Sequence, residues 1–594
     1  MITFKQTGEK FTDIYSAREA VLRFARAADG KARQKAELVF DQGKYKLSKS
    51  VVFSAKESPE LSKISLALSC EEGRAAFTSE KVLLPDDFKK EGEYYTYRFK
   101  KDADGKYPRL RDLYVNGKCI PMCKGDMFAY EFEIPLDGSD VPKGFYIPED
   151  AVSFLSGADS APLELTLYAE WEFMIFPIVR IERNRVRFDE NGKKHIFVGT
   201  EGSVFDFYLK KLVPYLQPKI RGEMFLCNHP GLLEEGTWCY DGNTGVLCYR
   251  GSIGIGTELS VPALDKLFVF EGMDGVALEN LEFTGVTDKF VCENGYISGQ
   301  ANMEKRLNHK AEEAAVFARG VSGFSVEKCC FWELGTNALL MVGDLARIYI
   351  RNSHFENIAM SAVSIGNPVG IFTDKRSCSF DIRVENNFIS HIGYEFPTSP
   401  AVNLFRVDGL SVCHNTIEYC AYSGISVGWN WAELDYALGE MVNIRDAKIA
   451  YNRICHHMQI LRDGGAIYAV GCNCTKKHTE FFNFMHDNFA YRDSVKRTVR
   501  GFYLDGASSN WHVYNSVASG AQRPMFSQFV AEGEFTHNIL VQNIYVTEGV
   551  EPENHAPERN TIYKNIYFAP TIDELLRKYP KAREIYENSG CKDI

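Results

Sequence analysis

The chain has 594 residues, more than one ordinary hydrophobic core supports, so it needs several domains or a repeat architecture. Its composition is globular, with 45% hydrophobic and 25% charged residues, and an aromatic content of 13% favours pleated, half-buried strands. The net charge of −11 argues against a nucleic-acid partner, because phosphate binding needs clustered Lys and Arg.

The N-terminal sequence has no apolar segment typical of a secretory signal. The sequence contains no run of about 18 apolar residues, so no membrane span is predicted. The 16 cysteines show no small-domain disulfide framework, so we expect reduced, mostly buried thiols. These features together predict a cytoplasmic protein without a membrane partner, and they leave the oligomeric state open.

The first 80 residues predict a helix followed by strands. Residues 15–28 have apolar positions at helical spacing, which predicts an amphipathic helix. Residues 37–53 alternate around Gly43, a pattern typical of strand, turn and strand. A helix here would cap the open end of a stack of strands, which otherwise exposes its core and its edges. We therefore expect residues 1–80 to hold a cap helix and the first strands of a larger β-structure.

The pattern changes between residues 81 and 205. Longer strand-like runs lie there between loops rich in Asp, Gly and Pro, which predicts an inserted antiparallel β-domain over 81–205. Further along, the turn at Asp241, Gly242 and Asn243 is expected to join two aromatic strands.

Residues 206–568 are predicted to form the main β-domain, and imperfect repeats run through it from about residue 265 to 568. Pairs of apolar residues five positions apart recur at intervals of 24 residues (326 to 350) up to 48 residues (278 to 326). The pairs are Leu278/Phe283, Val326/Phe331, Ile350/Phe355, Val384/Ile389, Val412/Ile417, Ile449/Ile454 and Phe484/Phe489. A polar residue lies near the middle of most pairs: Asn280, Asn352, Asn386, His414, Asn452 and His486. Such units predict a stack of similar coils, with equivalent strands about 4.8 Å apart. A β-propeller would need blades of regular length, so a parallel β-helix is favoured.

The C-terminal segment completes the predicted organisation. Residues 571–590 predict an amphipathic helix that docks on the last coil, within a terminal segment of 569–594. The expected fold class is therefore all-β: a right-handed parallel β-helix with an inserted antiparallel β-rich domain and short terminal helices.

Three successive coils carry strands of similar composition, at 423–429, 464–470 and 500–505. If these strands stack, Asp463 precedes the second strand and Asp505 ends the third. A pair of carboxyls can hydrolyse a sugar linkage, because one protonates the leaving oxygen while the other attacks the anomeric carbon or activates water. Asp before Gly is also an ordinary turn signal, so spacing alone leaves a structural role open for both.

Four aromatic residues are expected on or beside the same face: Trp429, Trp431, Tyr468 and Tyr503. Their rings could bind the C–H surfaces of a sugar, although packing in the core is the alternative. Two histidines, His456 and His457, lie shortly before the first aspartate and could orient a carboxyl or bind a sugar hydroxyl. They could equally be satisfied turn residues.

Three motifs of this region carry a family resemblance. The segments YSGISVGWNW (422–431), RDGGAIY (462–468) and GFYLDGASSN (501–510) resemble the β-helix enzymes of glycoside hydrolase family 141, which include fucosidases and xylanases. The runs LYVNGK (113–118) and WCYDGNTGVLCY (238–249) are also similar to pieces of those proteins. The resemblance therefore covers most of the chain.

The resemblance implies a glycosidase in which Asp463 and Asp505 match the catalytic carboxyls of the family. Gly506 follows the second of them, where the family commonly has an acidic residue. The sugar and the division of acid and base roles therefore stay open. An oligosaccharide substrate is implied, and Glu480 and the two histidines are the next candidates if the aspartates are turn residues.

Other functions remain as alternatives. A polysaccharide lyase or epimerase acting on uronic acids would need cations near the base, and Arg462 and Arg500 are the nearby candidates. A carbohydrate-binding β-helix without catalysis is the third possibility. Cys472, Cys474 and His478 lack the usual spacing of zinc ligands, so we expect no metal and no cofactor.

Overall fold

The computed structural model forms two compact units. It describes residues 1–133, 144–155, 162–189, 191–200, 219–304, 313–366, 378–429, 444–471, 483–506, 508–527, 537–548, 553–554 and 561–592. One unit comprises Met1–Ser79, Lys266–Thr284 and Glu312–Ile594, and the other comprises Glu80–Asp265 and Gly285–Ala311. No helix in these ranges is long and apolar enough to span a membrane.

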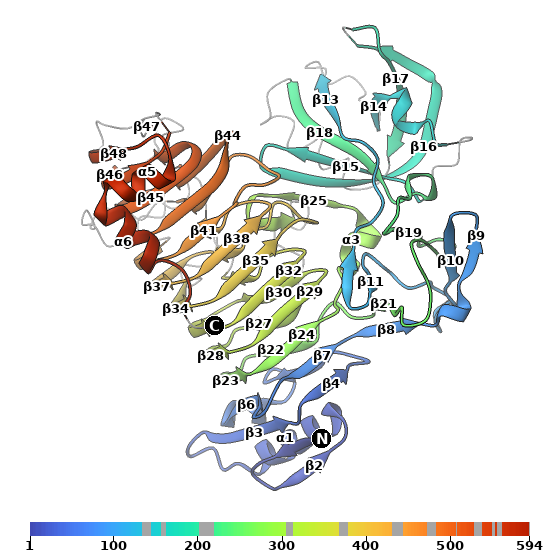
Figure 1. The fold of residues 1–594 in the computed structure, drawn as a ribbon. Helices are drawn as coiled ribbons and strands as arrows, with labels where there is room; N and C mark the ends of the chain where they lie inside the picture. The colour runs from blue at the N-terminus through green and yellow to red at the C-terminus, as the bar shows by residue number, and fades with distance from the viewer. Residues whose placement is uncertain are drawn as a thin grey trace. The chain divides into compact units, whose positions relative to one another are not determined.

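The first unit is a parallel β-helix, which confirms the predicted fold class (Figure 1). Each coil gives one strand to each of three parallel sheets, so that residues of successive coils pair directly: Ile350 pairs with Val384, and Val384 pairs with Val412. Six of the seven apolar pairs in the sequence mark interior positions, because alternate residues of a strand point to opposite faces of the sheet. The pair Phe484/Phe489 is one residue early, since Met485 and Ala490 are the residues that pair with Ile449 and Ile454.

The three sheets are named here by number. Sheet 1 contains β5 (Val51–Ser54), β22 (Phe268–Glu271), β27 (Ala314–Arg319), β30 (Asn337–Val342), β33 (Val363–Ile365), β36 (Val402–Leu404), β39 (Ile425–Val427), β42 (Gly465–Ala469), the ends of β44 (Phe489–Leu504) and β45 (Ser509–Ser527), and β47 (Glu553–Asn554). Sheet 2 contains β3 (Gln34–Phe40), β6 (Ile64–Cys70), β23 (Asp274–Glu279), β28 (Ser322–Glu327), β31 (Ala346–Arg351), β34 (Ser379–Glu385), β37 (Val407–Cys413), β40 (Ile444–Ala450), β43 (Asn483–His486) and the starts of β45, β46 (His537–Val546) and β48 (Thr561–Phe568). Sheet 3 contains β4 (Gly43–Lys46), β7 (Ala75–Thr78), β24 (Leu281–Thr284), β29 (Cys330–Leu334), β32 (His354–Ile358), β35 (Phe388–Ile392), β38 (Thr416–Cys420), β41 (Arg453–Cys455), the start of β44 and later parts of β45, β46 and β48.

A ladder of buried side chains crosses the turn between sheets 2 and 3. The amide oxygens of Asn387, Asn415, Asn452 and Asn488 each accept a hydrogen bond from the backbone N–H one coil earlier, at 3.0–3.1 Å. Of the polar residues predicted to form this ladder, Asn452 belongs to it. Asn280, Asn352, Asn386 and His414 instead occupy left-handed turn positions one residue earlier, and His486 ends β43.

Short helices pack against the first strands and against the last coils of this unit. Helix α1 (Ile14–Ala27) matches the predicted N-terminal helix, with Asp13 as its cap, and β1 (Ile2–Phe4), β2 (Glu9–Phe11) and η1 (Pro59–Lys63) complete that end. The predicted C-terminal helix is two helices, α5 (Ile572–Lys578) and α6 (Pro580–Asn588). Pro580 starts the second because proline fits the first turn of a helix and interrupts a preceding one.

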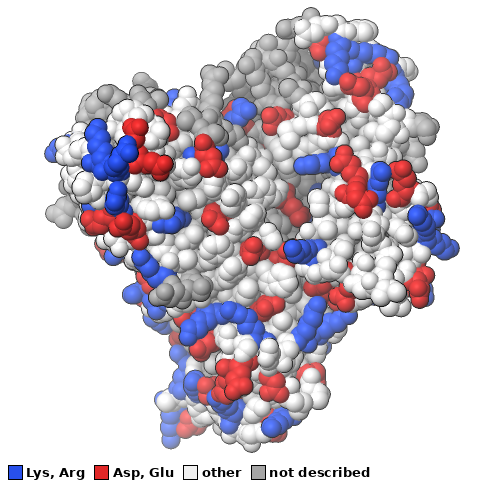
Figure 2. Space-filling view, in the orientation of Figure 1, with Lys and Arg blue, Asp and Glu red and all other residues white. Residues whose placement is uncertain are grey.

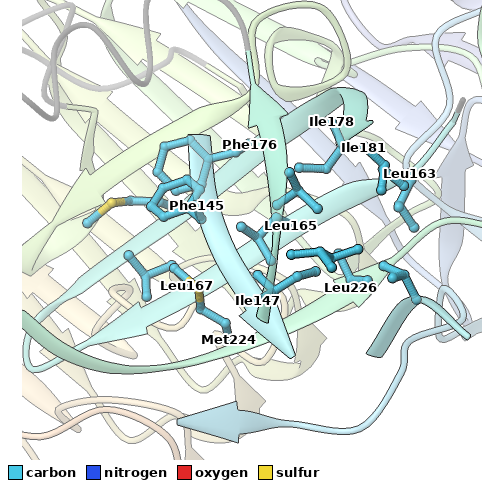
Figure 3. Close-up of a cluster of buried hydrophobic side chains, with 14 of the residues drawn as sticks. Phe145, Ile147, Leu163, Leu165, Leu167, Phe176, Ile178, Ile181, Met224 and Leu226 are labelled. Carbon is cyan, nitrogen blue, oxygen red and sulfur yellow. The ribbon is translucent and has the colours of Figure 1, made fainter. Parts of the chain in front are cut away.

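The second unit is an antiparallel β-structure. Its elements are β8 (Glu80–Leu83), η2 (Pro85–Asp87), β9 (Lys89–Glu91), β10 (Tyr94–Arg98), β11 (Leu113–Val115), β12 (Lys118–Ile120), β13 (Phe128–Glu133), β14 (Gly144–Pro148), η3 (Glu149–Val152), β15 (Glu164–Ala169), β16 (Glu172–Phe188), β17 (Lys194–Thr200), β18 (Lys219–Cys227), η5 (Pro230–Leu232), β19 (Thr237–Asp241), β20 (Val246–Arg250), β21 (Leu259–Pro262), α3 (Lys289–Asn294), β25 (Tyr296–Gly299), η6 (Gln300–Asn302) and β26 (Met303–Glu304). Figure 3 shows part of its own core, in which Phe145, Leu165, Phe176 and Leu226 converge.

The structure places the end of this unit later than the predicted boundary at residue 205. Strands β18, β20 and β21 follow that boundary, yet they pair antiparallel with β13 and β15, with β10, and with β8 and β11. The predicted range 206–568 therefore combines two parts: strands of the inserted unit up to Asp265 and the coils from Lys266 onward. The hairpin predicted around Gly242 is present, as β19 and β20.

Candidate active site

The three similar strands are neighbours in sheet 1, as predicted. Strand β42 pairs in parallel with β39 on one side and with the end of β44 on the other. Ile467 lies between Ile425 and Phe502 in this register, while Tyr468 pairs with Tyr503. Since successive side chains alternate between faces, the aliphatic residues fill the interior and the two tyrosines lie on the outer face of sheet 1.

Asp463 lies in the turn that precedes β42. Its carboxylate Oδ1 is 2.5 Å from Nη1 of Arg500 and 3.4 Å from the hydroxyl of Tyr503. The hydroxyl of Tyr422 donates to its backbone carbonyl at 3.0 Å. The side chain remains 30% exposed, so this carboxylate is fixed by a guanidinium and is open to a ligand.

Asp505 follows the last residue of β44 and is more deeply buried, with 7% of its surface exposed. Tyr468 donates its hydroxyl proton to Oδ2 at 2.5 Å, and the backbone N–H of Gly506 donates to Oδ1 at 2.8 Å. The rings of Tyr468 and Tyr503 meet edge to face at 5.1 Å.

Two neighbouring tyrosines therefore connect the two aspartates. Tyr503 donates to Asp463, and Tyr468 donates to Asp505. Because the two tyrosines pair in adjacent strands, both carboxyls lie at the same part of sheet 1. A pair of neighbouring carboxyls is what cleavage of a glycosidic bond requires.

Arg500 is held tightly in place. Its guanidinium stacks on the ring of Tyr503 at 4.4 Å and on the ring of Phe526 at 4.9 Å, and its side chain is 8% exposed. Its backbone carbonyl lies 3.2 Å from Nε2 of His457, which donates this hydrogen bond as a neutral imidazole. The ion pair with Asp463 is thus supported from two sides.

A glycine pair lets the chain enter β42 closely against its neighbour. A Cβ atom on Gly464 would lie 2.7 Å from both Sδ of Met458 and Oγ of Ser423. A Cβ on Gly465 would lie 3.0 Å from the carbonyl oxygen of Gly501 in the adjacent strand. These contacts explain why Gly-Gly follows Asp463.

Several residues predicted to bind a sugar contact other groups of the protein. Tyr468 and Tyr503 are almost fully buried and direct their hydroxyls at the carboxyls, instead of presenting free ring faces. His457 is fully buried beneath Arg500 and cannot contact a sugar. His456 stacks on Tyr419 at 4.5 Å and lies 3.3 Å from the carboxylate of Asp493.

Sugar binding by the two tryptophans stays a prediction. Trp429 is partly buried and packs edge to face against Phe405, with ring centroids 5.5 Å apart. Trp431 lies outside the described residues, as do Glu480, Cys472, Cys474 and His478.

The sequence indicated Arg500 only as a nearby cation and did not indicate Tyr422. The ion pair of Arg500 with Asp463 depends on the register of β42 and β44, which pairs Arg500 with Gly465, two residues after Asp463. Tyr422 acts through a backbone carbonyl one coil away, and the sequence carries no signal for such a contact.

Comparisons with known proteins bear on the fold. No family model matches the chain, and no curated protein matches it. A solved structure described as "Glycoside hydrolase" is similar over 97% of this chain and 95% of its own, with a TM-score of 0.69 and 18% sequence identity. Two others are a complex of XylC with xylose (TM-score 0.33, 8% identity, 90% and 77% covered) and the catalytic unit of an α-1,3-glucanase from Streptomyces thermodiastaticus (0.31, 11%, 76% and 97%). The first of these likenesses shows that the chain shares its fold with that protein.

Proposed function

We propose that the chain is a glycoside hydrolase in which Asp463 and Asp505 are the catalytic carboxyls. The observation that carries this proposal is that two neighbouring tyrosines, whose rings contact each other on adjacent coils, bind the two carboxyls: Tyr503 donates to Asp463 and Tyr468 donates to Asp505. Hydrolysis of a glycosidic bond needs such a pair, one carboxyl as acid and the other as nucleophile or base. The overall likeness to a solved glycoside hydrolase supports the same function.

The surroundings favour different roles for the two residues. Asp463 is paired with a guanidinium, which stabilises the carboxylate form that a nucleophile or base requires. Asp505 is buried and receives hydrogen bonds from neutral groups, the Tyr468 hydroxyl and the Gly506 N–H. The ion pair with Arg500 distinguishes Asp463 from Asp505, so we assign the nucleophile or base to Asp463 and the general acid to Asp505.

A lyase or epimerase is less well supported. Such an enzyme uses a cation to stabilise the charge that develops on a uronate carboxylate. Arg500 is the cation beside the pair, and its guanidinium is engaged by Asp463 and by two aromatic rings.

Three finer statements extend the proposal. The sequence resemblance suggests glycoside hydrolase family 141, with an oligosaccharide of xylose, fucose or a related sugar as the substrate. A reducing compartment such as the cytoplasm is also proposed. Cys239 and Cys248 face each other across β19 and β20 as free thiols, a pair that an oxidising compartment would tend to join.

The test is a screen on aryl glycosides of xylose, fucose, galactose and arabinose, read by release of the aryl group. A parallel assay follows the absorbance of the unsaturated product that a lyase forms. We expect hydrolysis of at least one glycoside and no unsaturated product. On an alkyl glycoside of the sugar found in this screen, whose leaving group needs protonation, Asp463→Asn and Asp505→Asn should each lower the rate by several orders of magnitude, because each removes one ionisable group.

The chain offers a matched control for the first variant. Asp446 is exposed on sheet 2 and, like Asp463, has a left-handed backbone (φ +51° and +58°), which asparagine tolerates. Asp446→Asn should leave the rate unchanged. Near-normal turnover in both active-site variants, on a glycoside that the parent cleaves, would reject the assignment.

A further inference from the structure

Arg492, near the start of β44, carries a buried guanidinium without a paired anion. The residue is 7% exposed, and its Nε and Nη1 atoms are enclosed with no hydrogen-bond partner in the described part of the chain. Asp493, the next residue, lies 3.3 Å from Nδ1 of His456 instead, and it is 70% exposed, so water screens its charge. A buried cation without a partner costs free energy, so an arginine kept in this state indicates a ligand that supplies the anion.

Two further side chains feel the charge of Arg492, and neither can neutralise it. His457 is fully buried and neutral, and its Nδ1 atom has no hydrogen-bond partner among the described residues either. Burial raises the pKa of the Tyr394 phenol to about 12, so this group keeps its proton. Tyr394 is 40% exposed, which means that solvent reaches the surroundings of the guanidinium.

The shape of the guanidinium selects a carboxylate as the anion. Nη2 is not among the enclosed atoms of Arg492, so a ligand can approach on that side. This nitrogen forms one edge of the planar group with Nε and another edge with Nη1, and both of those atoms lack a partner. The two oxygens of a carboxylate fit such an edge with two parallel hydrogen bonds. Reaching the second nitrogen needs shifts of neighbouring side chains, which binding commonly causes.

Arg492 also lies close to the proposed catalytic pair. It precedes Arg500 on the same strand, and His457 connects the two residues. The charge of Arg492 lowers the pKa of His457, whose Nε2 donates to the carbonyl of Arg500 at 3.2 Å. Arg500 in turn binds Asp463. A sugar unit bound at Arg492 can therefore belong to the oligosaccharide whose linkage meets the aspartates.

We propose that Arg492 anchors an acidic oligosaccharide by binding the carboxylate of a uronic acid unit in the chain that is cleaved. This proposal rests on the proposed function and names its substrate class. The uronic acid is held by its charge and is not the unit that reacts. The aspartates hydrolyse a neighbouring linkage, and no unsaturated product forms.

Saturation-transfer NMR tests the binding step without any reaction. The probes are glucuronate and galacturonate, with glucose and galactose as neutral counterparts and acetate as a simple anion. We expect the parent to bind at least one uronate more tightly than its neutral counterpart and more tightly than acetate. Arg492→Gln should lose this preference, because it removes the charge and keeps an N–H donor. Arg577→Gln, exposed on α5, is the matched control and should retain it.

Thermal unfolding separates a binding role from a structural one. Because an unpaired buried cation destabilises the fold, Arg492→Gln should melt no lower than the parent. The preferred uronate should raise the Tm of the parent and not that of the variant. A lower Tm of the variant with an unchanged preference for uronates would overturn the proposal. If Arg492→Gln does not fold, Arg492→Lys keeps the charge without the planar edge and should weaken uronate binding.

A kinetic comparison connects the binding site to cleavage. The substrates are an oligosaccharide with a uronic acid unit and its counterpart with the carboxyl reduced to an alcohol. The ratio of their kcat/KM values should fall about 10- to 100-fold in Arg492→Gln, as for the loss of a charged hydrogen bond, and should not change in Arg577→Gln. An unchanged ratio in Arg492→Gln would contradict the proposal.

The two assays also distinguish this proposal from the proposed function. Uronate binding that needs Arg492, without cleavage of any glycoside, would keep the binding site and reject the hydrolase. Cleavage that needs both aspartates, without any preference for uronates, would do the reverse.

Discussion

His457 supports the site from beneath, as a neutral residue. Its side chain is fully buried and its Nε2 donates to the carbonyl of Arg500. Burial, helped by the positive charge of Arg492, lowers the pKa of His457 to about 3. The imidazole therefore stays neutral through the pH range in which a glycosidase works, and it fixes the backbone of the residue that holds Asp463.

The burial of His457 as a neutral residue predicts a lower free energy of unfolding in acid. Between about pH 6.5 and pH 3 the unfolded chain binds a proton at His457 that the folded chain does not, so the free energy of unfolding falls as the pH falls. From pH 7 to pH 5 this residue should remove about 2 kcal/mol. His457→Gln keeps an N–H donor and does not titrate. Urea unfolding at both pH values should show a loss in the parent that is about 2 kcal/mol greater than in the variant, and equal losses would contradict the assignment.

At the scale of the elements, the asparagine ladder fixes the turn between sheets 2 and 3. Asn452 accepts from the backbone N–H of Asn415 at 3.0 Å and donates to the carbonyl of Val412 at 2.8 Å. It also donates to the side chain of Asn488 in the next coil. Each amide thus satisfies backbone groups that burial would otherwise leave unpaired.

Asn452→Ala should therefore be strongly destabilising. The variant leaves at least one buried N–H and one buried carbonyl without partners, at a cost of about 3 kcal/mol in the free energy of unfolding. Asn588→Ala, at the exposed end of α6, is the control and should change stability by less than about 0.5 kcal/mol. Denaturant unfolding measures both, and equal midpoints for Asn452→Ala and the parent would show that the ladder does not stabilise the fold.

The sequence predicted the interior positions of the coils well, because an apolar residue every second position identifies the buried face of a strand. It misplaced the polar ladder by one residue at Asn386 and His414, where two polar residues are adjacent: Asn386-Asn387 and His414-Asn415. The two residues of each pair differ in the sign of φ. The first residue has a left-handed backbone, and its side chain points outward. Sequence alone does not reveal that choice.

At the scale of the whole molecule, the aspartates, tyrosines and arginine of the proposed site all belong to the β-helix unit. The sequence predicted the stacked strands, and the catalytic role of the aspartates stays a prediction. It did not predict the contacts of Arg500, Tyr422 and Tyr503, which depend on three-dimensional register. The end of the inserted unit was also not predictable, because β18, β20 and β21 have partners far earlier in the chain. On the face drawn in Figure 2, basic and acidic side chains are interspersed, with no extended surface of one sign.

The central claim assigns different roles to two carboxyls, and one kinetic comparison tests it most directly. Asp505→Asn and Asp463→Asn are each assayed on a dinitrophenyl glycoside and on an alkyl glycoside of the sugar that the parent cleaves. An activated leaving group needs no protonation, so Asp505→Asn should keep most of its kcat/KM, which reports the first bond cleavage, on the dinitrophenyl substrate. On the alkyl substrate its kcat/KM should fall about 10²–10⁴-fold. Asp463→Asn should lose several orders of magnitude on both, because it lacks the nucleophile or base. Equal losses of Asp505→Asn on the two substrates, or near-normal rates in Asp463→Asn, would contradict the account.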